Sequence, residues 1–113
     1  MIKIYHNPRC QKSRQALQIL EESGESFEVI KYLEDVPSES ELRKILSCLG
    51  LKASHLIRKN EAVWKENYKN KLLDEEDLIQ IMLKHPKLIE RPIVVKNNKA
   101  VIGRPPEKVT SIL

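Results

Sequence analysis

The sequence predicts an α/β fold built on one four-stranded mixed sheet. Three observations predict it. A strand pattern, a helix pattern and a second strand pattern follow one another within residues 1–33. Residues 38–86 then carry only helical patterns, and residues 91–113 return to two strand patterns and a closing helix. A length of 113 residues suits one core, so we expect a single domain over 1–113 with a helical insertion at about 38–86.

The first half reads as a βαβ unit. Residues 2–5, IKIY, alternate apolar and polar side chains and predict a strand. Residues 13–23 place apolar side chains on one helical face, and Gly24 follows as a stop signal. Residues 26–33 alternate again and predict the second strand. A parallel pair joined by a helix is expected to cross over with a right hand.

The middle of the chain predicts helices with clear ends. Ser38 and Glu41 have the spacing of a capping box before the helix pattern of residues 36–51. Residues 54–68 predict one or two short helices. The pattern at 74–86 starts on Asp74 and stops at Pro86, with acids in its first turn and cations in its last, which complements the helix dipole.

The last part predicts a hairpin and a closing helix. Two β-branched stretches within residues 91–103 flank Asn97-Asn98, and asparagine tolerates the positive φ of a tight turn. Residues 105–113 predict the helix. The order βαβ, helices, ββα describes a thioredoxin-like (glutaredoxin-like) fold, in which the first helix begins at the crevice where α/β proteins bind ligands.

Composition narrows the functional classes. The chain is 41% hydrophobic and 32% charged, and no apolar run reaches the ~20 residues that span a bilayer. The start lacks a signal-peptide pattern, so we expect a cytoplasmic protein with reduced thiols. The net charge of +4 is scattered and aromatic residues are only 4%, which argues against nucleic acid. Two cysteines without ligand spacing predict no metal site and no structural disulfide.

Cys10 has an unusual position in the segment HNPRCQKSR. It follows a predicted strand and stands where a helix should begin. The free N–H groups of a helix start stabilise a thiolate, and Arg9, Lys12 and Arg14 should lower the thiol pKa further. The same N–H groups can hold a tetrahedral oxyanion. The sequence therefore predicts a nucleophile and an anion site in one place, with a packed core cysteine as the alternative.

The motif at this position is C-x-x-S. Ser13 cannot form a disulfide, but its hydroxyl can donate to a thiolate or to a bound oxyanion. A disulfide at Cys10 therefore needs a thiol from another molecule or from Cys48. Cys48 lies between Leu46 and Leu49 on a predicted helix, so we expect it in the core, with a resolving role as the alternative.

Four segments together resemble the ArsC family of arsenate reductases coupled to glutathione and glutaredoxin: YHNPRCQKSRQAL, LIRKNE, LIERPIVV and GRPPEKV. The form R-C-x-K-S-R is similar to a shorter branch of this family. The resemblance implies Cys10 as nucleophile and Ser13 as its hydrogen-bond partner. It further implies His6 and Asn7 as loop support, Arg58, Arg91 and Arg104 as oxyanion ligands, and Pro92 as a cis proline beside the thiol.

The resemblance implies reduction of arsenate to arsenite, with glutathione as co-substrate, glutaredoxin as partner and no tightly bound cofactor. Arginine suits this task because its fork matches arsenate oxygens. Other readings stay open. The three arginines taken singly could be surface residues, and His6 could be an acid–base group. The protein could be a glutathione-dependent thiol transferase, or a non-enzymatic regulator of the Spx type.

Overall fold

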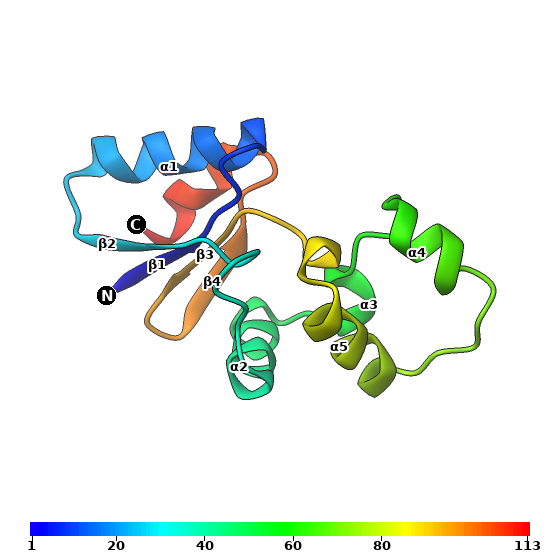
Figure 1. Ribbon diagram of the computed structural model, residues 1–113. Helices are drawn as coiled ribbons and strands as arrows, with labels where there is room; N and C mark the ends of the chain where they lie inside the picture. Colours follow the sequence, from blue (N-terminus) through cyan, green and yellow to red (C-terminus); the bar gives the residue numbers. More distant parts are fainter. The chain divides into compact units, whose positions relative to one another are not determined.

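The computed structural model describes all 113 residues, which form two compact units. One unit joins Met1–Asp35 with Arg91–Leu113 and holds the strands, and the other is the helical stretch Val36–Glu90. Figure 1 labels their elements. The helical unit encloses the insertion predicted at 38–86, and a single domain over residues 1–113 stays a prediction. Each unit is described in turn.

The sheet unit contains the predicted four-stranded mixed sheet. Its strands are β1 (Ile2–Tyr5), β2 (Phe27–Ile30), β3 (Ile93–Lys96) and β4 (Lys99–Ile102), in the order β2-β1-β3-β4. β1 runs parallel to β2 and antiparallel to β3, and β3 pairs antiparallel with β4. This is the predicted thioredoxin-like arrangement, in which the central strand β1 leads directly into the cysteine segment.

Helix α1 (Gln11–Ser23) covers one face of the sheet together with the C-terminal segment η2 (Pro106–Ile112), as Figure 1 shows in blue and red. α1 ends at Gly24, whose φ of 76° is the left-handed conformation expected of a glycine stop. The core beneath α1 consists of Ile2, Ile4, Ala16, Leu20, Val94 and Val109. These apolar positions are the ones that the period-2 and helical patterns place on facing surfaces.

The closing segment differs in one respect from the α-helix expected at residues 105–113. It is a 3₁₀-helix, with backbone bonds from Lys108 N–H to the Pro105 carbonyl and from Leu113 N–H to the Thr110 carbonyl. Two consecutive prolines stand at its start, and 3₁₀-helices are common as short segments of this kind.

The hairpin between β3 and β4 follows the sequence closely. Lys96 pairs with Lys99 across a two-residue turn, and Asn97 takes a φ of 58°. The ladder ends with the pair Ile93 and Ile102, and one further bond joins the Gly103 N–H to the Pro92 carbonyl at 2.9 Å. The residues just outside this bond, Arg91 and Arg104, therefore lie at the open end of the hairpin.

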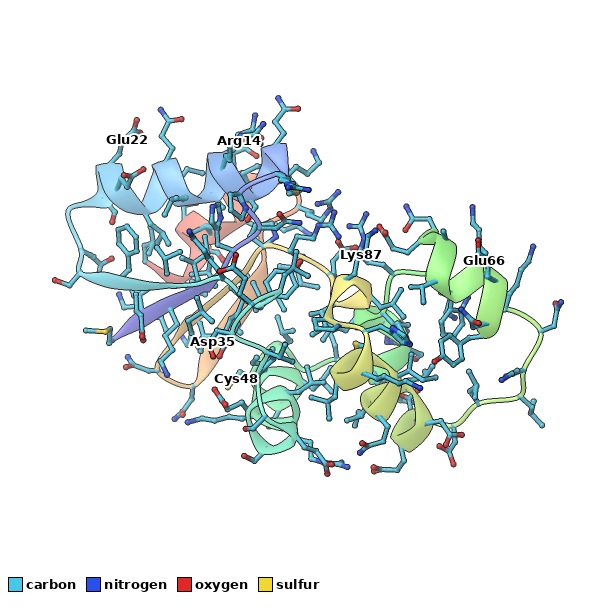
Figure 2. The ribbon with its side chains drawn as sticks, viewed as in Figure 1. Arg14, Glu22, Asp35, Cys48, Glu66 and Lys87 are labelled. Carbon is cyan, nitrogen blue, oxygen red and sulfur yellow. The ribbon has the colours of Figure 1, made fainter.

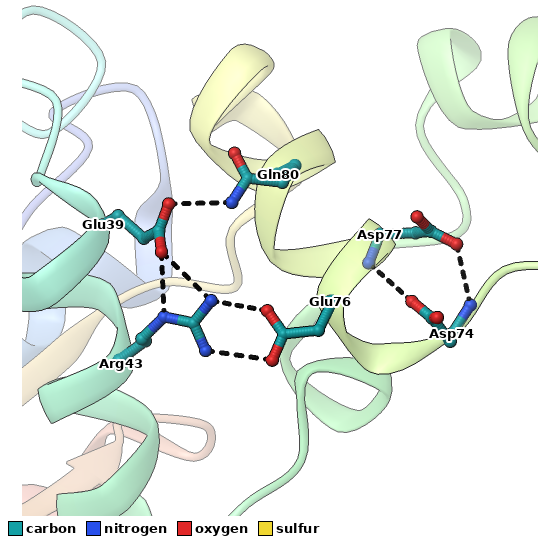
Figure 3. A network of polar contacts seen from close by, with 6 residues as sticks. All are labelled: Glu39, Arg43, Asp74, Glu76, Asp77 and Gln80. Carbon is teal, nitrogen blue, oxygen red and sulfur yellow. Dashed lines mark hydrogen bonds and ion pairs between the residues drawn. The ribbon is translucent and has the colours of Figure 1, made fainter.

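The helical unit contains α2 (Glu39–Leu49), α3 (Ala53–Leu56), α4 (Ala62–Asn67), α5 (Glu75–Lys84) and the short 3₁₀-helix η1 (Pro86–Leu88). Ser38 and Glu41 form the predicted capping box of α2, and Asp74 and Asp77 form one for α5. Figure 3 shows the second box beside an exposed network in which Arg43 bridges Glu39 on α2 and Glu76 on α5.

The segment between α3 and α4 is tied to the end of the helical unit. Ile57 pairs with Ile89 in an isolated antiparallel bridge, and Arg58 N–H donates to the Leu88 carbonyl at 2.7 Å. Trp64 on α4 is buried and packs against Tyr68. None of the helices has both the length and the apolar character needed to cross a bilayer.

Candidate active site

A turn places Cys10 at the start of α1. Cys10 N–H donates to the Asn7 carbonyl at 3.0 Å, and Pro8 supplies the fixed φ that favours the second position of such a turn. The Asn7 side-chain oxygen accepts from Arg9 N–H at 3.0 Å, which is the local bond that favours asparagine here. Cys10 becomes the N-cap residue of α1 and its carbonyl accepts the first helical bond, from Arg14 N–H.

A buried polar cluster of His6, Asn7 and Ser13 supports this turn. Ser13 is fully buried, and His6 and Asn7 are nearly so. The Ser13 hydroxyl oxygen lies 2.7 Å from His6 Nδ1 and accepts from Asn7 N–H at 3.0 Å. These two contacts hold the hydroxyl within the loop, and it is the Ser13 backbone N–H that bonds to the Cys10 thiol. Ser13 supports the loop through its side chain.

Burial disfavours the charged form of the His6 ring. Burial lowers the pKa of His6 below its usual 6.5, and the positive charge of Lys31 lowers it further. Its backbone N–H donates to the Ile30 carbonyl at 2.8 Å, which fixes the residue at the end of β1. The buried contact between the His6 ring and the Ser13 hydroxyl agrees with the loop-supporting interpretation of His6, and the acid–base role stays the alternative.

Two arginines from the other end of the chain act on the thiol. Arg104 Nη1 donates to Cys10 Sγ at 3.7 Å and to the Arg91 carbonyl at 3.0 Å. The peptide bond between Arg91 and Pro92 is cis, which confirms the expectation, and the bond between Arg104 and Pro105 is cis as well, which we did not predict. Arg104 thus connects the thiol, the backbone before Pro92 and the end of β4.

The pKa of the Cys10 thiol is lowered. Burial raises it, but the Ser13 backbone N–H and hydrogen bonds from the Arg91 and Arg104 side chains outweigh that effect. The helix-start contribution was predicted from the sequence. The cations were expected to be the neighbours Arg9, Lys12 and Arg14, whereas those that bond to the sulfur come from the ends of the hairpin.

Arg14 has a different role from the one expected. Its side chain is exposed on α1 (Figure 2), and its Nη1 donates to the Pro8 carbonyl at 2.9 Å. This bond closes the turn over the first helical residues, so Arg14 stabilises the loop that carries Cys10. Sequence order alone could not separate this role from a charge on the thiol, because both place a cation within one helical turn.

Arg58 belongs to the helical unit, where two carboxylates hold it. Its Nε donates to Glu61 at 3.2 Å and its Nη1 to Glu90 at 2.6 Å. Its side chain is only 12% exposed. Burial lowers the pKa of Arg58, but these two partners more than offset that effect and raise it. Sequence reasoning missed both glutamates, although the i,i+3 spacing of Arg58 and Glu61 was visible. Oxyanion binding by Arg58 stays a prediction.

Cys48 is partly exposed on α2 rather than buried in a core as expected (Figure 2). The buried side of α2 carries Leu42, Ile45 and Leu46. Cys48 follows Leu46 by two positions, a rotation of roughly 200° on a helix, so it falls outside that stripe. Both cysteines are free thiols.

The ligand that suits this site is an anion. No cluster of three or more histidine, cysteine, aspartate or glutamate side chains comes together as a metal site. The groups that gather at Cys10 are one thiol of lowered pKa, the N–H groups of a helix start and two guanidinium groups. Each of them interacts favourably with negative charge.

A thioredoxin-like fold with one activated cysteine at the start of its first helix defines a class of thiol-reactive proteins. Within this class, the chain belongs to the ArsC family, whose model matches residues 5–112. It is 52% identical to uncharacterized protein YfgD of Escherichia coli strain K12, over 99% of this chain and 96% of that protein. It is 46% identical to an arsenate reductase of Neisseria meningitidis, over 99% and 97%. The structure of an arsenate reductase from Vibrio cholerae superposes with a TM-score of 0.93 at 48% identity, covering 99% of this chain and 97% of that one.

Proposed function

We propose that this protein is an arsenate reductase that uses Cys10 as nucleophile and glutathione and glutaredoxin as thiol donors. The observation that carries the proposal is the thiol itself: Cys10 caps α1, has a lowered pKa and accepts a hydrogen bond from Arg104. Membership of the ArsC family and relatives named arsenate reductase support the choice of oxyanion.

The first step forms a bond between sulfur and arsenic. Arsenate carries about two negative charges at neutral pH, and Arg91 and Arg104 lie where they can balance that charge while the thiolate attacks. The Cys10 sulfur bonds to arsenic(V), and one arsenate oxygen takes up protons and leaves as water. The product is a thiol-bound arsenate ester, and no oxidation state has changed. The family resemblance adds Arg58 to the proposed oxyanion ligands.

The second step reduces arsenic. A glutathione thiolate attacks the Cys10 sulfur, and the electron pair of the sulfur–arsenic bond passes to arsenic, which leaves as arsenite. Two thiols have supplied two electrons, and Cys10 remains as a mixed disulfide with glutathione. Glutaredoxin then takes the glutathione by thiol–disulfide exchange and restores the Cys10 thiol. The steps at Cys10 are covalent catalysis with electrostatic stabilisation of an oxyanion.

The experiment is steady-state reduction of arsenate with glutathione and glutaredoxin. We expect turnover by the wild type and by Cys48→Ser, and none by Cys10→Ser. Oxyanion binding is measured separately, as protection of Cys10 from alkylation by arsenate or sulfate. Arg91→Ala and Arg104→Ala should each weaken protection by roughly ten- to a hundredfold, the value of one charged hydrogen bond. Equal protection in folded variants would refute the oxyanion step.

A second function is favoured by the pairing of Arg58. Since Glu61 and Glu90 balance its charge within the helical unit, the sheet unit brings two arginines to Cys10, enough for one carboxylate. The protein could then bind a carboxylate of glutathione and act as a thiol transferase. Exchange with glutathione disulfide, combined with no protection by arsenate, would establish that function in place of arsenate reduction.

A further inference from the structure

Gly103 occupies the point where three parts of the sheet unit meet. It follows β4 directly and its N–H donates to the Pro92 carbonyl, so it faces Pro92 across the end of the hairpin. On its sides lie Ala16 of α1 and Val109 of η2. Its neighbour in sequence is Arg104, and the neighbour of Pro92 is Arg91. Gly103 and Pro92 are therefore the two residues that set the positions of the arginines.

No side chain fits at this position. A β-carbon built on Gly103 would lie 2.9 Å from Pro92 Cγ, 3.3 Å from Val109 Cγ2 and 3.5 Å from Ala16 Cβ. The first distance is shorter than real carbon contacts allow. The surrounding residues cannot yield easily, because Ala16 and Val109 are fully buried and Pro92 is a stiff ring that is fully buried too. A methyl group here must displace the ring or the chain beside it.

Glycine is required at position 103 because a side chain has no space there, and not because the backbone needs a positive φ. Gly24 and Gly50 have positive φ values of 76° and 67° and end helices, and a β-carbon on either would meet nothing. Gly103 does not have a positive φ, so alanine could adopt its backbone. The absence of a side chain at Gly103 thus serves close packing of Pro92 against α1 and η2.

A displacement of the chain at Gly103 would alter the contact between Arg104 and the Cys10 thiol. Arg104 follows Gly103 by one residue, and its Nη1 reaches both the Arg91 carbonyl at 3.0 Å and Cys10 Sγ at 3.7 Å. A shift of a few tenths of an ångström would lengthen the sulfur contact beyond ordinary hydrogen-bond range for sulfur. Cys10 is carried by α1, which also supplies Ala16 to the contact, so both partners of the thiol–arginine pair depend on the packing at Gly103.

We propose that Gly103 is a positioning residue for the thiolate: its missing side chain allows Pro92, Arg91 and Arg104 to approach the start of α1. The inference concerns the reactivity of Cys10 and holds for any substrate that the thiolate attacks. Its failure is therefore distinguishable from failure of arsenate reduction.

The test is Gly103→Ala in a Cys48→Ser background, with the Cys10 pKa read from the pH dependence of thiolate absorbance. We expect the pKa to rise toward that of a free cysteine, with a thiolate-to-thiol ratio at fixed pH lower by about two- to tenfold, as for a weakened hydrogen bond to a charged group. The matched control is Val101→Ala, which loosens the same hairpin two residues earlier without pushing on Pro92. It should lower the melting temperature and leave the pKa unchanged.

A folded Gly103→Ala protein with the wild-type pKa overturns the proposal, as does an equal pKa rise in Val101→Ala. If Gly103→Ala does not fold, the double variant Gly103→Ala with Val109→Ala takes its place, because it removes the Val109 Cγ2 atom that would lie 3.3 Å from the new β-carbon and keeps the 2.9 Å contact with Pro92 Cγ. It should fold with a raised pKa. A wild-type pKa in this variant, or its failure to fold, overturns the proposal, since a positioning role requires that the core survives.

Discussion

Replacing Arg104 by alanine should deprive the Cys10 thiolate of one of its stabilising cations. Arg104 Nη1 donates to the sulfur and to the Arg91 carbonyl, so the change removes a charged hydrogen bond and frees the carbonyl that holds Arg91 in place. The Ser13 N–H and the Arg91 side chain still act on the thiol. We therefore expect the pKa of Cys10 to rise but not to lose the whole of its lowering.

The magnitude follows from the geometry. A hydrogen bond to a charged group contributes about 1.5–3 kcal/mol, and a 3.7 Å contact to a partly exposed sulfur belongs at the lower end. About 1.4 kcal/mol is a tenfold change in the thiolate-to-thiol ratio. A thiolate of higher pKa is also more nucleophilic, with a Brønsted coefficient of about 0.4–0.5, so the alkylation rate below the pKa should fall only about threefold.

The assay is thiolate absorbance against pH, with alkylation rate as a second readout, for Cys48→Ser protein with and without Arg104→Ala. Arg104→Lys should recover part of the effect, since it keeps the charge and loses the fork. The control is Lys12→Ala, which removes an exposed cation beside Cys10 in sequence. If Lys12→Ala raises the pKa as much as Arg104→Ala does, or if Arg104→Ala leaves it unchanged, the assignment of the lowered pKa to this contact is refuted.

Three further predictions concern stability. The folded pKa of Cys10 is lowered, so the thiolate contributes its full stabilisation of the fold above the free-thiol pKa of about 8.5. This stabilisation is lost as the pH falls through the folded pKa. Denaturation of the wild type and of Cys10→Ser at several pH values checks the prediction. The folded pKa of His6 is lowered too, so stability should decline as pH falls below about 6.5, and His6→Asn should remove that decline while keeping an atom near Nδ1. Arg58→Ala leaves two half-buried carboxylates without this partner and should lower the free energy of unfolding by about 1–3 kcal/mol in a denaturant titration. Arg43→Ala, in the exposed network of Figure 3, should lower it far less. Equal losses of stability in the two variants would contradict the distinction between the buried and the exposed ion pairs.

The sequence allowed the order of elements, their caps and the place of the thiol to be predicted, because those features depend on local patterns. Capping boxes, a glycine stop and an asparagine turn each act over four residues or fewer. The features that were not predicted are side-chain contacts that depend on the tertiary structure. No local pattern pairs the Ser13 hydroxyl with His6, and none pairs Arg58 with Glu90, which is 32 residues away. The packing around Gly103 joins residues of α1, η2 and the segment before β3, so no local pattern predicts it.

The buried position of Ser13 bears on which thiol can form a disulfide with Cys10. Cys10 is the only cysteine of the sheet unit, and Ser13, the position at which a C-x-x-C protein has its second thiol, is fully buried and committed to His6 and Asn7. Sulfur at that position would be larger and a weaker hydrogen-bond acceptor, so Ser13→Cys should disturb the loop rather than supply a working resolving thiol. A disulfide at Cys10 must therefore be formed with a thiol from outside the sheet unit. This requirement follows from the single cysteine of the sheet unit, and it is the physical reason to couple Cys10 to a separate thiol such as glutathione in the proposed cycle.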